Sequence, residues 1–162
     1  MEERQRLLEE IPADATVPAG FLREIQAVGS QAATSIDRLR EVMLVVVENE
    51  GACPDDSTWR VLLPSWFVNA CAEEQTEAES DEWLRRWRAS SLQGRAQMEA
   101  ATAWALGDWC YWLGENRPWS SWDIRRDGEH VRWRLLVQDD QAPVGAAEWL
   151  VTASGLQVVD VR

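Results

Sequence analysis

The stretch that decides the fold is Trp122-Asp123-Ile124-Arg125-Arg126-Asp127-Gly128-Glu129-His130-Val131-Arg132-Trp133-Arg134. Its Asp-Gly pair is a strong signal for a two-residue turn between antiparallel strands. With Asp127 and Gly128 as the turn, the pairs on one face are Arg126–Glu129, Ile124–Val131 and Trp122–Trp133. The pairs on the other face are Arg125–His130, Asp123–Arg132 and Ser121–Arg134. One register thus sets apolar against apolar and charge against charge, which predicts a β-hairpin.

The polar face of this hairpin is expected to carry the one concentrated basic patch of the chain. Its members are Arg125, His130, Arg132 and Arg134. Guanidinium groups bind carboxylates and phosphates in a forked geometry, so an anion site is one hypothesis. The alternative is that these side chains pair with Asp123 or with the acidic residues 73–82, or keep an exposed sheet face hydrated.

The chain after the hairpin predicts one helix and one strand. Asp139 and Asp140 turn the chain, and Pro143 stands where a helix over residues 144–153 can begin. Gly155 stops that helix, and residues 156–161 form a last strand. Residues 119–162 are therefore expected to be a strand-strand-helix-strand unit.

Helical patterns dominate the chain before the hairpin, over residues 31–114. Apolar residues at positions 36, 39, 43, 46 and 47 predict a helix from a cap at Thr34 or Ser35 to Gly51. Residues 59–63 form a short strand, or a turn into a brief helix that Pro64 begins. Residues 100–113 are apolar on nearly every face, which predicts a central or partner-covered helix ended by Gly114.

The first thirty residues predict two short helices around a break between Pro12 and Pro18. The apolar residues on which this rests are Leu7, Leu8 and Ile11 for the first helix and Phe21, Leu22, Ile25 and Val28 for the second. These residues are part of the domain or a loosely attached helical arm. The fold class is α+β, with a helical N-terminal two-thirds packed on a small C-terminal sheet in one domain.

Length and composition predict a soluble protein of the cytoplasm. The chain has 162 residues, of which 46% are hydrophobic and 27% charged. Its longest strongly apolar run, residues 42–47, is far below the roughly 20 residues of a membrane-spanning helix, so no membrane contact is expected. The start of the chain lacks the pattern of a secretory signal. Cys53, Cys71 and Cys110 are unclustered, which favours free thiols in a reducing compartment.

The reactive residue types are few. All sixteen cationic residues are arginine, so a phosphate-loop lysine and Schiff-base chemistry are excluded within this sequence. One histidine, His130, excludes a two-histidine metalloprotease motif, and the cysteines lack the close pair spacing of zinc sites. No cofactor or metal is expected. A dyad of Cys110 and His130 stays open, although nothing in the sequence brings the two together.

The charge balance points to a basic protein as partner. Twenty-eight acidic residues against sixteen arginines leave a net charge of −12, which repels nucleic acid. Residues 73–82 hold six carboxylates and no base: Glu73, Glu74, Glu77, Glu79, Asp81 and Glu82. They form a solvated helix start, since Thr76 and Glu79 have capping-box spacing, or they mimic nucleic acid toward a basic partner. The pairs Asp81–Arg85 and Glu82–Arg86 have the spacing of ion pairs on that helix.

Eleven tryptophans are more than a small core normally uses. Each indole N–H needs an acceptor when it is buried, and Asp108 is a plausible internal acceptor. Core packing accounts for most of the tryptophans. The alternative is an aromatic surface for a protein or a flat ligand, made by Trp109, Trp112, Trp119 and Trp122.

Several strings between residues 60 and 155 carry a resemblance to other proteins. They are Leu63-Pro64-Ser65-Trp66-Phe67-Val68, Trp83-Leu84-Arg85-Arg86-Trp87-Arg88, Asp108-Trp109-Cys110-Tyr111-Trp112-Leu113, Trp119-Ser120-Ser121-Trp122-Asp123 and Gly145-Ala146-Ala147-Glu148-Trp149-Leu150. The chain resembles a group of small uncharacterised tryptophan-rich acidic proteins of high-GC bacteria, an origin that the lysine-free composition also suits. This resemblance brings no activity and no site residue. Small acidic immunity proteins of bacterial toxin systems are similar to this chain in size, charge and α+β make-up.

These observations favour a non-enzymatic acidic binding protein, an immunity-like or regulatory partner of a basic protein. One alternative is a small-molecule or anion binder that uses a tryptophan-lined surface and the arginine face. A cryptic hydrolase is the third hypothesis.

Overall fold

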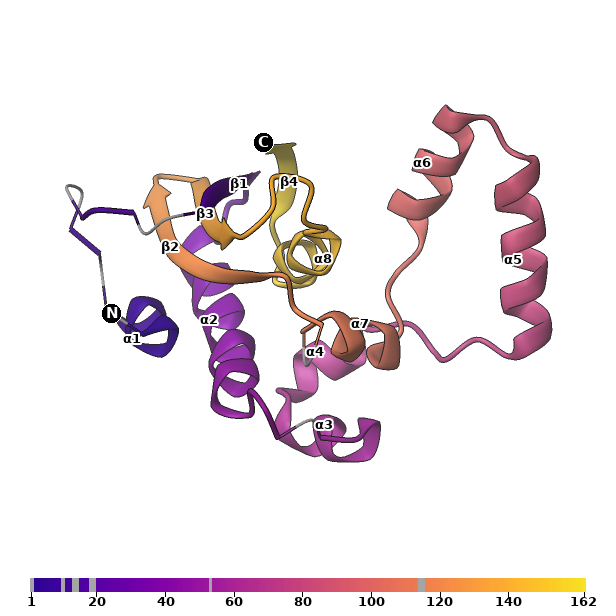
Figure 1. The fold of residues 1–162 in the computed structure, drawn as a ribbon, viewed down its shortest axis with the longest axis horizontal. Helices are drawn as coiled ribbons and strands as arrows, with labels where there is room; N and C mark the ends of the chain where they lie inside the picture. The colour runs from indigo at the N-terminus through magenta and orange to yellow at the C-terminus, as the bar shows by residue number, and fades with distance from the viewer. Residues whose placement is uncertain (1, 10, 13–14, 18–19, 53, 114–115) are drawn as a thin grey trace.

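The computed structural model describes residues 2–9, 11–12, 15–17, 20–52, 54–113 and 116–162, apart from the side chain at position 100. The fold is α+β, as predicted (Figure 1). The helices described are α1 (Glu3–Leu8), α2 (Ala32–Glu48), α3 (Asp56–Leu62), α4 (Ser65–Ala70), α5 (Glu77–Ala89), α6 (Leu92–Ala101), α7 (Leu106–Leu113) and α8 (Gly145–Ala153). The strands described are β1 (Phe21–Val28), β2 (Trp119–Asp127), β3 (His130–Val137) and β4 (Gln157–Val161). They form one antiparallel sheet in the order β2-β3-β1-β4.

Residues 21–28 are a strand, so the helix predicted there is wrong. β1 lies between β3 and β4 inside the sheet. Its fully buried side chains, Ile25 and Ala27, alternate as a strand requires. Leu22 and Val28 are partly buried on the opposite face, and apolar residues on both faces of an inner strand imitate a helical period. Residues 21–28 therefore belong to the sheet and not to a helical arm, and the sheet is only mostly C-terminal.

The predicted hairpin of β2 and β3 is present with a different turn. The turn residues are Gly128 and Glu129, and Asp127 lies opposite His130. Gly128 has a φ of 59°, as the first position of a type I′ or II′ turn requires. Ile124 consequently pairs with Trp133, two residues beyond its predicted partner. A slide by two residues leaves each side chain on its predicted face.

A β-bulge at Trp122 changes the pairing of β2 further. The turn already sets Asp123 opposite Arg134, so the predicted pairs Asp123–Arg132 and Trp122–Trp133 are wrong. The register then shifts between Ser121 and Asp123, so Ser121 lies opposite Leu135 and Trp122 is the extra residue of β2. Ser121 turns to the buried face, where its Oγ accepts a 2.9 Å hydrogen bond from the indole N–H of Trp133. Trp122 instead packs beneath Arg6 of α1, whose guanidinium carbon is 5.4 Å from the ring centroid.

The core lies between the sheet and helices α2 and α8. Leu39, Met43 and Leu150 from these helices are fully buried with Trp133 of β3 in one apolar cluster. Each such side chain stabilises the fold by roughly 1.5–3 kcal/mol. The strand-strand-helix-strand order of the C-terminal third is confirmed, and Gly155, with a φ of 101°, ends α8.

Some predicted helix limits are wrong. α2 begins at Ala32, and residues 56–62 are helix α3, capped by Asp55, so both the short strand and the turn considered for residues 59–63 are wrong. The brief helix considered after them is present as α4, with Pro64 at its N-cap. The helix predicted over residues 100–113 is divided into α6 and α7. Between them, Ala105 forms a β-bridge with Ala72, whose N–H donates to the carbonyl of Trp104. Gly114, the predicted cap, lies outside the described residues.

Helices α5 and α6 form a hairpin that stands apart from the rest of the molecule (Figure 1). We call residues 73–101 the acidic arm. None of its described side chains is buried. Trp83 and Trp87 stack with centroids 6.4 Å apart, and the guanidinium of Arg95 lies 4.4 Å from the Trp87 centroid. Within the described ranges, no helix combines the length and apolarity needed to cross a membrane.

Candidate functional site

The four tryptophans predicted to form an aromatic surface are not together on the surface. Trp109, Trp119 and Trp122 are only 0%, 4% and 6% exposed. The indole N–H of Trp109 donates to the carbonyl of Ala146 in the core. Trp112, at 36% exposure, is the member that solvent reaches. The predicted surface is therefore wrong for three of its residues, because α7 and β2 turn Trp109 and Trp119 toward the core and α1 packs over Trp122.

Asp108 is not the internal acceptor that the sequence suggests. It is exposed on α7, and none of the described indoles donates to it. The hydrogen bonds of the half-buried indoles go elsewhere: from Trp66 to Glu41, from Trp83 to Thr102 and from Trp87 to Glu99. Partial desolvation, followed by repulsion from Glu74 and Asp56, raises the pKa of Asp108 above its ordinary value.

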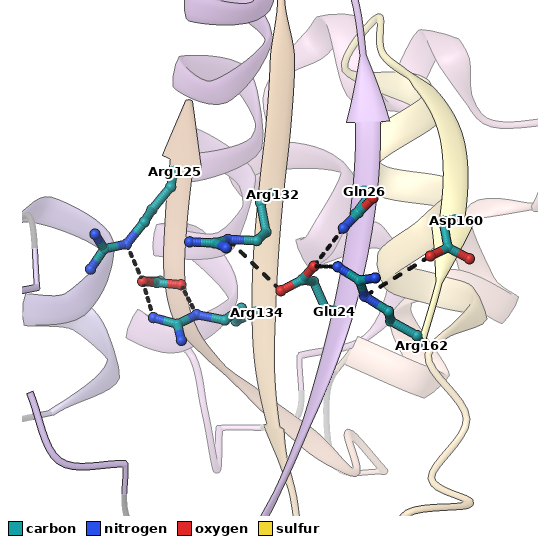
Figure 2. Close-up of polar contacts among 8 residues, drawn as sticks. Glu24, Gln26, Arg125, Arg132, Arg134, Asp160 and Arg162 are labelled. Carbon is teal, nitrogen blue, oxygen red and sulfur yellow. Dashed lines mark hydrogen bonds and ion pairs between the residues drawn. The ribbon is translucent and has the colours of Figure 1, made fainter. Parts of the chain in front are cut away.

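The predicted basic patch lies on the sheet face away from the core, where it is paired with acids (Figure 2). Asp123 accepts hydrogen bonds of 2.7 Å from both Arg125 and Arg134. Burial acts to raise the pKa of Asp123, but the hydrogen bonds from Arg134 and Arg125 outweigh it and lower this pKa. Two of the four proposed anion-binding residues therefore already bind a carboxylate of the same chain.

A second cluster on this face is centred on Glu24 of β1 (Figure 2). Its carboxylate accepts hydrogen bonds from Gln26 at 2.7 Å and Arg162 at 2.8 Å, and lies 3.8 Å from Arg132. Burial opposes ionisation of Glu24, but the bonds from Gln26 and Arg162 lower its pKa. His130 lies exposed at the end of β3. Anion binding by these residues remains a prediction that would have to displace internal carboxylates.

The six carboxylates of residues 73–82 divide into two groups. Three are used within the chain: Glu74 accepts from the N–H of Gly107 at 3.0 Å, Glu79 closes the predicted capping box with Thr76, and Glu82 pairs with Arg85. The last pair replaces the two predicted i,i+4 pairs. Glu73, Glu77 and Asp81 are exposed and form no hydrogen bond or ion pair through their side chains with the described part of the chain.

An open groove lies between the acidic arm and helices α7 and α8. Its volume is about 780 Å³, within the range of about 300–1,000 Å³ that small-molecule sites occupy. Five aromatic side chains line it: Trp83, Trp104, Tyr111, Trp112 and Trp149. Three carboxylates line it as well: Glu99, Asp108 and Glu148. We call this the aromatic groove; none of the described arginines is among its lining residues.

The carboxylates of the aromatic groove lack close cationic partners. Glu99 accepts a 2.7 Å hydrogen bond from Trp87. Burial raises the pKa of Glu148, and attraction to Arg23 of β1 opposes this rise only in part. Because no described group donates a hydrogen bond to the carboxylate of Asp108 or Glu148, both are available to a ligand.

Most residues of this groove were missed in the sequence, although a local signal exists. Asp108, Tyr111 and Trp112 have i,i+3 and i,i+4 spacing, which places them on one stripe of α7. Glu148 and Thr152 share a stripe of α8 in the same way. A polar and aromatic stripe on an otherwise apolar helix indicates a face that does not enter the core. That these two stripes face the arm follows only from the tertiary fold.

The described thiols are not activated. Desolvation is the largest effect on both, and it raises the pKa of Cys110 to about 12 and that of Cys71 to about 11. Such thiols are protonated near neutral pH, whereas nucleophilic cysteines have a lowered pKa. No described hydrogen bond joins Cys110 to His130, and Cys53 lies outside the described residues. In the described ranges, no group of three or more His, Cys, Asp or Glu residues is placed to hold a metal ion.

Comparisons of this chain with family models, with curated proteins and with solved structures find no match. The resemblance to small tryptophan-rich acidic proteins therefore stays a prediction. Function has to be inferred from the contacts, exposure and charges of this chain's own residues.

Proposed function

We propose that this protein is a non-enzymatic binding protein that docks a basic protein partner through its acidic arm. The observation that carries the proposal is an ordered helical hairpin with no buried side chain among its described residues. Such a segment contributes little apolar burial to the stability of the fold. Its capping box and tryptophan stack nevertheless hold it in a defined form, which supports a role directed outward.

The charge of the arm supports a basic partner. Glu73, Glu77 and Asp81 stand exposed near the start of α5 without internal partners among the described residues. A net charge of −12 attracts a basic protein over a distance and accelerates its association. The arginines of the arm lie later in α5 and in α6, so the start of α5 is the end that we assign to docking.

Apolar contacts would slow the dissociation of such a complex. Leu84, on α5 itself, is 39% exposed. Exposed apolar side chains within a charged surface are typical of interface centres, where their burial adds binding free energy to that of the charge attraction. An immunity-like or regulatory role fits this combination. The free thiols of Cys71 and Cys110 support a reducing cytoplasm as its setting.

The test is the binding of a peptide rich in arginine and leucine, with an acidic peptide of equal length as the control. Calorimetry should give saturable binding of the basic peptide. We expect the affinity to fall at least about tenfold between about 50 and about 300 mM salt, because Debye screening weakens charge attraction. The acidic peptide should not bind.

Matched charge variants locate the site. The arm variant Glu73→Gln, Glu77→Gln, Asp81→Asn removes three exposed carboxylates and should weaken the basic peptide at least about fivefold. The control variant Glu2→Gln, Asp37→Asn, Glu129→Gln removes the same charge from exposed positions elsewhere and should change the affinity less than about twofold. Equal losses in the two variants, or affinity that is insensitive to salt, would overturn docking through the arm.

A further inference from the structure

We propose that the aromatic groove is a binding site for a small organic molecule that carries a guanidinium group. The site is argued independently of the proposed protein partner: Trp83 and Glu99 of the arm line it, but the docking carboxylates Glu73, Glu77 and Asp81 do not. Three features of the groove support such a ligand: its volume, its aromatic walls, and carboxylates that form no ion pair with the described residues.

The walls of the groove offer aromatic faces from separate parts of the chain. Trp83 comes from the arm, Trp112 from α7 and Trp149 from α8. Tyr111 and Trp112 are 59% and 36% exposed, and their rings contact edge to face with centroids 5.4 Å apart. Large rings left in contact with water beside a groove are typical of a ligand site. Aromatic faces attract cations through the electrostatics of the ring.

The charge of the groove selects the class of ligand. Glu99, Asp108 and Glu148 face it, and none of the described arginines lines it. An anion would meet three carboxylates, whereas a cation would find acceptors in Asp108 and Glu148, to which no described group donates. A guanidinium satisfies both features, because its flat face stacks on a ring while its edge donates several hydrogen bonds to carboxylates.

Two half-buried indoles of the chain already carry a guanidinium over the ring, and one of them, Trp87, lies on the arm beside the groove. The guanidinium of Arg95 lies 4.4 Å from the centroid of Trp87, and the indole N–H of Trp87 donates to Glu99 at 2.7 Å. The guanidinium of Arg38 lies 5.4 Å from the Trp66 centroid, and Trp66 donates to Glu41 in the same way. In both places the indole, and not the guanidinium, donates to the carboxylate, so the chain itself supports only the stacking of a guanidinium on an indole.

Two carboxylates of the groove, Asp108 and Glu148, have a raised pKa, as expected for acids without a close cation. Desolvation raises the pKa of Asp108, and Glu74 and Asp56 raise it further. Desolvation also raises the pKa of Glu148, which Arg23 counteracts only partly. A bound guanidinium would favour the ionised form of both groups, so its affinity should fall as the pH is lowered through these raised values.

The experiment uses phenethylguanidine as the probe, titrated into the full chain and followed by tryptophan fluorescence and calorimetry. We expect a Kd of about 0.1–1 mM, which is typical of a small cation on exposed rings. Phenethyltrimethylammonium has the charge but no N–H donors and should bind at least about threefold more weakly. Phenylpropionate and phenethyl alcohol should show no saturable binding. Equal or tighter binding of any of these three would overturn the guanidinium assignment.

Variants place the probe in the groove. Asp108→Asn with Glu148→Gln should weaken phenethylguanidine at least about tenfold, and Trp112→Leu at least about threefold. Glu73→Gln with Glu77→Gln removes the same charge outside the groove and should leave the Kd within about twofold. Trp112 is exposed, so its variant tests the aromatic wall separately from the carboxylates. An unchanged Kd in either groove variant that remains folded would overturn the site.

Discussion

Asp123 is a nearly buried carboxylate that two arginines share. Its side chain is 4% exposed, and the nitrogens of Arg125 and Arg134 hold it from two directions. Arg125 also donates to the carbonyl of Ile11, which ties the segment after α1 to the same group. A buried charge of this kind is costly unless every partner is present, so the three side chains act as one unit.

Removal of the Asp123 carboxylate should destabilise the fold because it leaves Arg134 and Arg125 without their acceptor. We expect Asp123→Ala to lower the free energy of unfolding by roughly 2–4 kcal/mol. Urea denaturation followed by circular dichroism measures this loss. The control is Asp127→Ala, at an exposed end of the same strand, which should cost less than about 1 kcal/mol. Similar losses of unfolding free energy in the two variants would show that the carboxylate shared by the two arginines does not stabilise the fold more than an exposed one.

At the scale of elements, α1 is a short helix whose position depends on charge. The side chains of Arg117 and Glu3 are 3% and 9% exposed, and their bidentate contacts measure 2.7 and 2.8 Å. Glu3 also accepts from the N–H of Ser121, and Arg6 donates to the Ser121 carbonyl. α1 thereby satisfies backbone groups of the edge strand β2 at its bulge, which protects an edge that would otherwise be available for pairing.

The capping box of α5 should decide whether the acidic arm stays folded. Thr76→Ala removes the side-chain acceptor for the N–H of Glu79, at a cost of about 1 kcal/mol. Because the arm buries no described side chain, we expect faster hydrogen exchange in α5 and no change in α2. Thr34→Ala, at an exposed position inside α2 that is not its cap, is the control. A loss of protection in α2 as well would mean that the arm and the core unfold together.

The elements differ in how well the sequence predicts them. α5 was predicted from Thr76, Glu79 and its apolar stripe, because a cap and a helical period are contacts within a few residues. β1 was predicted as a helix, because an inner strand with Leu22 on one face and Ile25 on the other does not alternate strictly. The hairpin lay between these cases: its glycine turn was predicted near the right place, and the bulge at Trp122 was not.

On the scale of the whole molecule, two groups of carboxylates respond to pH in opposite directions. Asp123 and Glu24 have a lowered pKa in the folded state, so their stabilisation is complete above the unfolded value of about 4 and is lost as the pH falls through the folded value. Asp108 and Glu148 have a raised pKa, so their ionised forms destabilise the fold. That effect is relieved as the pH falls through their folded values.

Stability should therefore be higher in mildly acidic solution than at neutral pH, as long as the pH stays above the range in which Asp123 and Glu24 become protonated. Acidification from about pH 8 first protonates Asp108 and Glu148 and reduces the repulsion within a chain of net charge −12. Further acidification then breaks the pairs of Asp123 and Glu24. Urea denaturation across this pH range measures the profile. The variant Asp108→Asn with Glu148→Gln should be more stable than the unchanged chain near pH 7. Its stability should also rise less toward pH 5. A steady fall in the stability of the unchanged chain from pH 8 to 5 would contradict this assignment.

The candidate site could be predicted only in part. The sequence indicates an acidic segment, which lies in the arm, and an excess of tryptophan, of which five of the eleven residues belong to the arm or line the groove. It does not indicate which indoles face solvent, since Trp109 and Trp112 are neighbours on one helix with 0% and 36% exposure. Exposure is decided by what packs against each face, and residues far away in the chain provide that packing.

By itself, the sequence determined the α+β class, the hairpin near Gly128, the capped start of α5 and the strong negative charge. Each of these depends on composition or on interactions between residues close together in the chain. Only the tertiary structure decided that Glu24 meets Arg132 and Arg162, and that Trp83 lines the same groove as Trp149. These residues are far apart in the chain, so their proximity depends on the packing of the whole fold, which local patterns do not specify.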